Sequence, residues 1–402
     1  MKKFLLSVLV LMFSAFTVVA DDFQLPNSDF EDWSGATFDG KEQPKSWNAS
    51  NVEQSALGMT FRFNFANKVA GRSGYCLMVQ DQVVGAATVT ETSPAYFSLG
   101  TAWQYLDGLN TSTATAGTTG GMSFTHYPDS VSVWIKRTGN NTDKEDFHIL
   151  FYSWSGTAKG TTYKNKSGDC TSTTRTDEES DIRIALNWNQ CKTVTPGGQV
   201  AEGWWRERAT YSTWTNIRVP IFYMNNDAPK KCNLIFSASN YPNFRDNQGL
   251  YEGNSLYVDD VELIYSSKIH KLEVGEKEWK GFDPNSTDVQ IYSLGENATE
   301  VPDVVAYRGN GSLTNVPNLS TTKTVTFPGR KLTGSEISVV KGNLTNVPTT
   351  ITVTSEDGKS TTVYKIQFQK AASSNAKLAG ITVNGDALSG FSPTKYNYTV
   401  DH

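Results

Sequence analysis

The architecture follows from one segment, Asn254-Ser255-Leu256-Tyr257-Val258-Asp259-Asp260-Val261-Glu262-Leu263-Ile264-Tyr265. Leu256 and Val258 share one face of an extended strand, because successive side chains point to opposite faces. The apolar residues after the two aspartates, Val261, Leu263 and Tyr265, would lie on the opposite face of a regular strand. One face can point into a core throughout only if the chain gains a residue at Asp259-Asp260, and a β-bulge does this. We therefore predict a long core strand with a bulge at the aspartate pair.

Two carboxylates at a bulge are costly to bury unless something compensates their charge. A calcium ion, which prefers hard oxygen ligands, is one solution, and backbone N–H groups are another. The segment also closes a unit, because Ser266 and Ser267 introduce a new sequence pattern.

The N-terminus has the pattern of a secretory signal peptide. Lys2 and Lys3 precede an apolar run that ends in Val18-Val19-Ala20, a small-residue cleavage signal. We expect residues 1–20 to be removed and the protein to be exported, to the periplasm, the cell surface or the medium. The alternative is an N-terminal membrane helix. No cysteine follows the run, which argues against a lipid anchor, and no later stretch reaches the roughly 20 apolar residues of a membrane span.

Composition narrows the class of protein. The 402 residues carry a net charge of −5, which argues against a nucleic-acid partner. Ten Trp, 17 Tyr and 20 Phe are many for a chain that is only 38% hydrophobic and 19% charged. This balance is typical of an exported all-β protein with long polar loops.

The four cysteines are Cys76, Cys170, Cys191 and Cys232. Export permits disulfides, and four cysteines allow three pairings. Cys170 and Cys191 lie in polar, loop-like sequence, so we favour that pair. Cys76 and Cys232 lie in apolar, strand-like sequence, where buried free thiols are an equal alternative. The spacings do not suggest zinc.

Short apolar runs separated by turn residues, without a long helical period, predict a sandwich or jelly roll. These runs are 75–79, 96–99, 131–137, 147–154, 182–188, 214–223, 233–237 and the opening segment. The stretches 104–121 and 156–180 are polar and rich in Gly and Thr. Long loops of this kind in compact domains are usually functional or mobile.

Strands 131–137 and 147–154 carry the most distinctive chemistry. One face of each is apolar, and we expect the second faces to form a common solvent-facing surface. An aromatic solvent-facing surface can stack on sugar rings. The alternative is that loops or another domain cover it. The residues of this surface are Trp134, His148, Tyr152 and Trp154.

A second aromatic group consists of Trp188, Trp204 and Trp205, near several charged residues. It could line the rim of a groove or cap the open end of the sandwich. His126 has no identifiable carboxylate or serine partner in the sequence, so we interpret it as a structural or rim residue.

Three segments resemble the carbohydrate-metabolism domain family of secreted Bacteroides-type proteins. They are Asn27-Ser28-Asp29-Phe30-Glu31-Asp32-Trp33 with Pro44…Trp47; Ala95-Tyr96-Phe97-Ser98-Leu99-Gly100…Gly121-Met122-Ser123-Phe124-Thr125-His126-Tyr127-Pro128-Asp129-Ser130-Val131; and Ile235-Phe236-Ser237-Ala238-Ser239…Gly253 through Leu263. The resemblance spans essentially all of 21–265. It departs at His126, where the family is often basic, and at 130–137, which has fewer Gly and Tyr residues. No catalytic residue is carried over from it.

The same start and end also resemble jelly-roll carbohydrate-binding modules, which pair an Asn-x-x-Phe-Glu start with a terminal Asp-Asp-Val strand. In those modules the two meet at a structural calcium ion. The resemblance implies that Glu31 and Asp260, with Asp259 as the alternate, would be the ligands here. It also implies a jelly-roll carbohydrate-binding domain over 21–265.

After Tyr265 the sequence repeats itself. Lys268-Ile269…Leu272…Val274…Trp279…Gly281-Phe282…Pro284 recurs at a constant offset as Lys377-Leu378…Ile381…Val383…Leu388…Gly390-Phe391…Pro393. The first unit, 268–374, ends in a predicted hairpin about Asp357-Gly358. It resembles the immunoglobulin-like or cadherin-like repeats of bacterial surface proteins, which are β-sandwiches of this size. We expect 375–402 to be the start of a second, incomplete repeat.

Three functions are compatible with these features. The one we favour is a non-catalytic protein that binds a polysaccharide or other glycan on a jelly roll carried by immunoglobulin-like spacers. The second is a glycoside hydrolase, which would need two carboxylates about 5–10 Å apart in a groove. Glu202, Glu207, Asp246 and Glu252 are available for it, but no motif selects a pair. The third is a structural adhesin or stalk with protein partners.

Overall fold

The computed structural model describes residues 23–56, 58–86, 89–107, 110–155, 164–165, 168–169, 185–187, 198–239, 250–314, 324–371, 378–395 and 397–399. Within these ranges the only helical element is the short 3-10 turn η3 (Gly334–Glu336), and all other regular elements are β-strands. The predicted all-β sandwich class is confirmed. None of the elements in these ranges is a helix long and apolar enough to cross a membrane.

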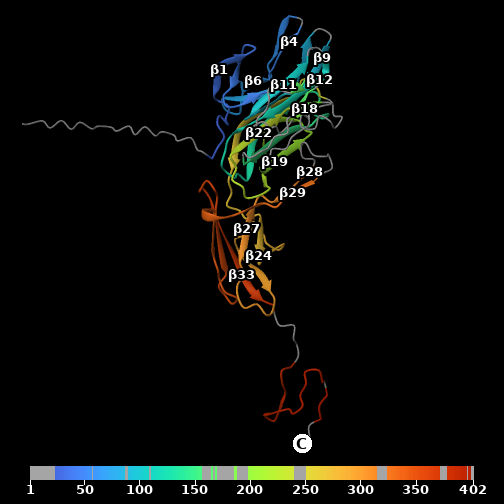
Figure 1. Ribbon diagram of the computed structural model, residues 1–402. Coiled ribbons are helices and arrows are strands. Elements are labelled where there is room, and N and C mark those ends of the chain that lie inside the picture. The colour runs from blue at the N-terminus through green and yellow to red at the C-terminus, as the bar shows by residue number, and fades with distance from the viewer. Residues whose placement is uncertain are drawn as a thin grey trace, which may run out of the picture.

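The first part of the chain folds into two facing antiparallel sheets (Figure 1). The sheet that we call the β15 sheet has the order β21 (Phe222–Tyr223), β19 (Gln199–Glu207), β15 (Phe147–Trp154), β22 (Lys231–Ser237), β10 (Tyr96–Ser98) and β3 (Asn48–Ala49), and β13 (Met122–Ser123) also pairs with β22. The β14 sheet has the order β20 (Tyr211–Pro220), β14 (Ser130–Thr138), β23 (Ser255–Ile264), β7 (Tyr75–Gln80) and β6 (Ala66–Ala70).

The core lies between these two sheets. Val131, Val133 and Ile135 of β14 belong to one buried cluster with Ile149 and Phe151 of β15. The alternation of buried and partly exposed residues along β14 follows the two-residue period of a strand. Each such side chain contributes about 1.5–3 kcal/mol on burial, so this cluster is the main source of stability.

Strand β23 contains the predicted bulge. Along its pairing with β14 the register shifts by one, so that Asp260 and Val261 together lie opposite Val133. Asp260 has φ 44°, a left-handed conformation that a non-glycine residue rarely adopts. Val258 before the bulge and Val261 after it are both buried. The extra residue therefore restores the core-facing parity, as the sequence predicted.

Smaller hairpins surround the first sandwich. Strands β11 (Thr101–Asp107), β12 (Asn110–Thr119) and β18 (Ala185–Asn187) form a three-stranded sheet. The two-stranded pairs are β1 (Trp33–Phe38) with β2 (Lys41–Pro44), β4 (Val52–Ala56) with β5 (Met59–Phe63), β8 (Gln82–Ala86) with β9 (Val89–Ser93), and β16 (Lys164–Asn165) with β17 (Gly168–Asp169). Cys76 and Cys232 are buried and free, which confirms the free-thiol alternative for them. Cys170 and Cys191 lie outside the described residues.

A second sandwich follows, with its own core. One sheet has the order β25 (Lys277–Glu278), β24 (Lys271–Val274), β27 (Val304–Arg308) and β30 (Arg330–Lys331). The other has the order β26 (Val289–Leu294), β33 (Thr361–Lys370), β32 (Thr349–Thr354) and β31 (Ile337–Val340), with β26 parallel to β33. Strands β32 and β33 form the predicted hairpin about Asp357-Gly358. The domain limits and the immunoglobulin-like class remain predictions.

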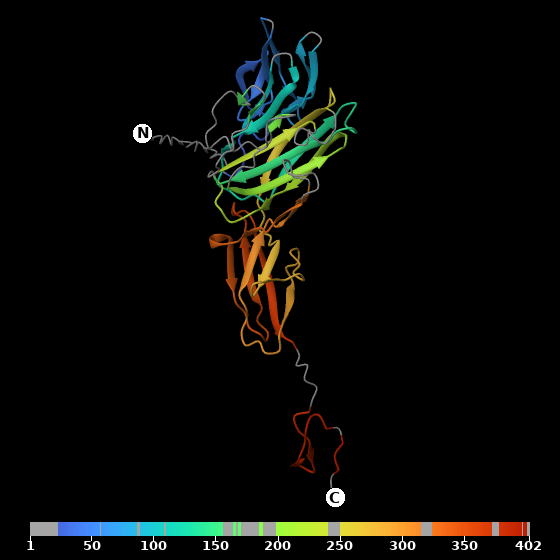
Figure 2. The ribbon, with the colours of Figure 1, turned by 45° about the vertical axis from the view of Figure 1, so that its right-hand side comes forward.

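The start of this unit recurs near the C-terminus. Strands β34 (Thr382–Val383) and β35 (Asp386–Ala387) pair as β24 and β25 do. Both turns have two residues with positive φ, and the Trp279 N–H to Leu272 carbonyl bond of 2.8 Å has its counterpart between Leu388 and Ile381 at 2.8 Å. The sequence repeat is therefore also a repeat of local structure, and Figure 2 shows its second copy beyond the second sandwich.

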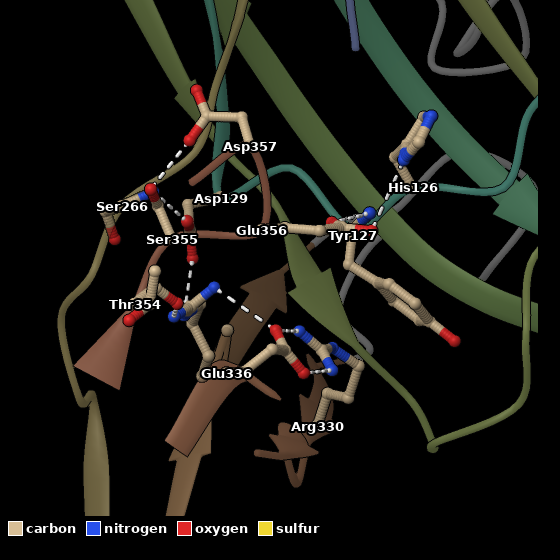
Figure 3. Close-up of polar contacts among 12 residues, drawn as sticks. His126, Tyr127, Asp129, Ser266, Arg330, Glu336, Thr354, Ser355, Glu356 and Asp357 are labelled. Atoms are coloured by element: carbon tan, nitrogen blue, oxygen red, sulfur yellow. Dashed lines mark hydrogen bonds and ion pairs between the residues drawn. The ribbon is translucent and has the colours of Figure 1, made fainter. Parts of the chain in front are cut away.

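The two sandwiches share a buried polar interface (Figure 3). The Arg308 guanidinium, with an exposed side-chain fraction of 0%, lies 3.6 Å from carboxylate oxygens of both Asp129 and Glu336. Asp129 also accepts a 2.6 Å hydrogen bond from the Ser266 N–H. Glu336 forms a bidentate pair with Arg330 at 2.7 and 2.5 Å. These contacts join elements on both sides of the predicted boundary.

His126 belongs to the same interface. Its Nδ1 lies 3.4 Å from Glu356 Oε1, and the other oxygen of Glu356 accepts a 2.6 Å hydrogen bond from the Tyr127 N–H. The Glu356 side chain comes from the β32–β33 turn of the second sandwich, as Figure 3 shows. His126 is therefore a contact between the sandwiches, which agrees with its interpretation as a structural residue.

A hairpin of the second sandwich reaches back onto the first. It consists of β28 (Gly311–Thr314) and β29 (Thr324–Phe327), and Figure 1 shows it below β19. The two ends of this hairpin form backbone hydrogen bonds with Tyr223. The Tyr223 N–H donates to the Gly309 carbonyl at 2.8 Å, and the Tyr223 carbonyl accepts from the Gly329 N–H at 3.0 Å. The second sandwich thus contributes structure to the first and is more than a spacer.

Candidate functional site

The four residues predicted to form one aromatic surface lie on two different sheets. Trp134 is on β14, whereas His148, Tyr152 and Trp154 are on β15, and these strands belong to facing sheets. Their second faces point away from the common core in opposite directions. The prediction of one shared surface is wrong, because the two-residue period gives the parity within a strand but not the sheet that the strand joins.

The surface on β15 is a buried layer. Tyr152 and Trp154 have exposed fractions of 0% and stack with ring centroids 5.1 Å apart. They belong to one apolar cluster with Leu313 and Phe327 of the β28–β29 hairpin. The expectation of a solvent-facing platform on this strand is therefore also wrong, and the alternative of cover by another domain holds.

The tryptophans of β19 do not form a pair. Trp204 is buried on the face of the β15 sheet that points away from the main core. There its Nε1–H donates to His148 Nδ1 at 3.1 Å, and the two rings stack. Trp205 packs against the main core, and its Nε1–H donates to Glu207 at 3.3 Å. Neighbouring residues of a strand point to opposite faces, so the two cannot line one rim. Trp188 lies outside the described residues.

The same parity argument applies to the carboxylates considered for hydrolysis. Glu202 and Glu207 lie five positions apart on β19, so their side chains point to opposite faces. Glu202 is buried and accepts a 2.6 Å bond from Gln199. Glu252 is exposed in the loop before β23, and Asp246 lies outside the described residues. Glu202 and Glu207 therefore do not flank a common point.

The three predicted metal ligands do lie close together, around the turn between β6 and β7. Asp259 accepts a 2.8 Å hydrogen bond from the Arg72 N–H, and Asp260 pairs with the Arg72 guanidinium. Glu31 accepts a 2.8 Å bond from the Tyr75 N–H. The N-terminal segment is held beside the bulge, because the Val261 N–H donates to the Ser28 carbonyl at 2.8 Å.

Glycines make room for these carboxylates. A Cβ at Gly71 would lie 2.6 Å from Asp259 Oδ2, and a Cβ at Gly74 would collide with the Glu31 carboxylate. Burial, together with the Asp260 charge, raises the pKa of Asp259 to about 6, and the N–H groups of Arg72 and Asp260 oppose this shift. The groups that compensate these carboxylates are thus backbone N–H groups and the Arg72 guanidinium.

These hydrogen-bond donors already occupy the carboxylate oxygens, whereas a calcium ion needs several oxygens that converge on it. Within the described ranges, no group of three or more His, Cys, Asp or Glu side chains is placed to hold a metal ion. The backbone-donor alternative accounts for the geometry. Calcium binding remains a prediction.

The outer face of the β14 sheet carries a different aromatic group. Trp214 of β20, Trp134 of β14 and Tyr257 of β23 are all partly exposed, and they come from three adjacent strands. Lys136 lies opposite Tyr257, with its Nζ 4.1 Å from that ring centroid and 5.6 Å from the Trp214 centroid. We call these four residues the β14-sheet face.

Polar and cationic groups border this face. The Arg72 guanidinium lies 3.8 Å from the Trp134 ring centroid. Asn216, opposite Trp134, donates to Ser132 Oγ at 3.0 Å. Planar rings that alternate with hydrogen-bonding groups can pack against the C–H face of a sugar and bind its hydroxyls.

Tyr257 and Trp214 were not among the predicted site residues, although the sequence contained a signal for both. Tyr257 has the parity opposite to the core residues Leu256 and Val258, and Trp214 has the parity opposite to Ile217 and Val219. Both positions were therefore identifiable as outward-facing. Their grouping with Trp134 depends on the strand order of the sheet, which the sequence does not give.

The comparisons with known proteins are weak. No family model matches the chain, and no curated protein matches it. Among solved structures, a "putative glycoside hydrolase" from Bacteroides thetaiotaomicron VPI-5482 is similar at 15% identity and a TM-score of 0.36, covering 60% of this chain and 71% of its own. Another protein of that description, from Bacteroides vulgatus ATCC 8482, is similar at 16% identity and a TM-score of 0.32, covering 59% and 96%. At these scores neither likeness supports an argument about fold or activity.

Proposed function

We propose that this protein is an exported glycan-binding protein whose binding surface is the β14-sheet face. The observation that supports the proposal is the row of partly exposed aromatic side chains, Trp214, Trp134 and Tyr257, on three adjacent strands. The resemblance of the chain's start and of its Asp-Asp-Val strand to carbohydrate-binding modules agrees with it.

Physical chemistry explains why such a surface would suit a sugar. Three adjacent strands span about 10 Å, since neighbouring strands lie about 4.8 Å apart. The rings supply apolar contact at low entropic cost, and Asn216 and Ser132 supply hydrogen-bonding groups beside them. On an open surface of this kind the stacking rings would supply most of the contact with the sugar.

The test is a glycan array followed by affinity measurements on the full chain. Trp134→Ala should weaken binding about fivefold, the equivalent of about 1 kcal/mol for one stacking ring, with little change in melting temperature. Trp154→Ala is the matched control on the facing sheet. Because Trp154 is fully buried, its truncation should destabilise the fold by about 3–5 kcal/mol.

Binding that survives Trp134→Ala, Trp214→Ala and Tyr257→Ala unchanged would rule out this face. An array without any glycan signal would favour the structural adhesin. Release of reducing sugars by the wild-type protein would instead favour the hydrolase, although Glu202 and Glu207 point to opposite faces of β19.

A further inference from the structure

Three cations of the β14 sheet and its β6–β7 turn lie over aromatic rings with part of their side chains exposed. Lys68 lies 4.3 Å from the Tyr75 centroid, Arg72 lies 3.8 Å from that of Trp134, and Lys136 lies 4.1 Å from that of Tyr257. A ring face attracts a cation, so this placement explains how each long side chain is held. It does not by itself neutralise the charge.

The three cations differ in their carboxylate partners. Lys68 pairs with Glu42 at 3.1 Å, and Arg72 pairs with Asp260. Lys136 forms no ion pair with any carboxylate in the part of the chain that the structure describes. The nearest acidic residue along the same face of β23 is Asp259, whose oxygens already accept the N–H groups of Arg72 and Asp260.

The position of Lys136 makes this charge chemically useful. It is fixed between rings of the two flanking strands, Trp214 on β20 and Tyr257 on β23, in the middle of the β14-sheet face. A ligand that packs on these rings would bring its substituents within reach of the ammonium group. An anionic substituent would pair with it, whereas a neutral sugar would have to pack beside an unpaired charge.

We propose that the β14-sheet face selects anionic glycans, with Lys136 as the residue that pairs with their carboxylate or sulfate groups. This inference rests on the proposed glycan-binding function of the same face. Lys136 is a specificity-determining residue in this proposal, and the three rings provide contact that both neutral and charged sugars can use.

The experiment measures binding of the full chain to five polysaccharides. Polygalacturonate carries carboxylates, dextran sulfate carries sulfates, and chondroitin sulfate carries both groups. Dextran and galactan are the neutral polymers. The wild type should bind one or more anionic polymers, and added salt should weaken binding, because exposed charges are screened. Lys136→Met should lose about fivefold in affinity for the anionic polymer, and Lys136→Arg should retain it. Lys68→Met is the matched control, since Lys68 also lies over an aromatic ring but is already paired, and its affinity should equal that of the wild type.

The outcomes separate this inference from the proposed function. If neutral and anionic glycans bind equally, and Lys136→Met binds as the wild type does while Trp134→Ala does not, the inference is wrong and the proposed function stands. If no polymer binds, or the ring variants bind as well as the wild type, both are wrong. If Lys68→Met loses as much affinity as Lys136→Met, the effect is general surface charge and the specific role of Lys136 is excluded.

Discussion

At the scale of single residues, the most unusual feature is a pair of buried carboxyl groups. Asp81 and Glu145 both have exposed fractions of 0%. One oxygen of each has a donor, the Ala95 N–H for Asp81 at 2.6 Å and the Asn254 amide for Glu145 at 2.5 Å. The second oxygen of each lacks a donor among the described residues. The two groups interact with each other, so their titrations belong to the pair rather than to either residue alone.

This pair predicts how stability depends on pH. Burial raises the pKa of Asp81 and that of Glu145, the latter to about 7, and the Arg137 charge opposes both shifts. Since an unfolded Glu has a pKa of about 4.3, the folded state binds more protons between about pH 4.3 and 7. Stability from this pair is therefore fully present at low pH and falls as the pH rises through that window.

Glu145→Gln should reduce this slope, because it removes one of the two buried carboxyl groups, and urea midpoints measured between about pH 5 and pH 8 would show the change. Glu262→Gln, at an exposed position of β23, is the control and should keep the wild-type slope. A Glu145→Gln protein with the same pH profile as the wild type would mean that the pair does not hold the extra proton.

At the scale of elements, the bulge of β23 is held by Arg72 and by backbone N–H groups. If these donors are sufficient, chelator should leave the melting temperature of the full chain unchanged. Asp260→Ala should then destabilise by about 1–3 kcal/mol, because it loses the partly exposed Arg72 pair and puts alanine in a left-handed conformation that aspartate tolerates better. The measurement is thermal unfolding with and without EDTA. A large fall in the wild-type melting temperature on chelation, absent in Asp260→Ala, would instead establish the calcium ion by linkage.

At the scale of the whole molecule, the buried ion pairs couple the two sandwiches. Arg308 is completely buried between Asp129 and Glu336, and burial alone raises the pKa of Asp129 while the Arg308 charge opposes the shift. The β28–β29 hairpin adds apolar contact, because Leu313 and Phe327 belong to the cluster that contains Trp154. Two domains with an interface of this kind should not unfold independently.

We therefore expect a single calorimetric transition for both sandwiches. Arg308→Met should destabilise this unit by about 3–5 kcal/mol, because it leaves buried carboxylates without their partner. Arg62→Met is the control, since Arg62 pairs with Glu53 on the surface at 2.7 Å, and its transition should coincide with that of the wild type. Two separate transitions in the wild type, or a loss confined to the second sandwich, would contradict the coupling.

The sequence by itself determined the features that depend on local order along the chain. Strand parity located the bulge at Asp259-Asp260, and the repeated spacing identified the second copy of the β24–β25 hairpin. Each of these follows from the two-residue period of a strand or from turn residues a few positions apart.

Only the tertiary structure decided which strands share a sheet and what covers each face. Trp134 and Trp154 have equivalent patterns in sequence, yet one is partly exposed and the other is buried under a hairpin more than 150 positions further on. The partner of Asp260 is likewise Arg72, far away along the chain. Strand order and interdomain cover are set by long-range packing, which a local period does not encode.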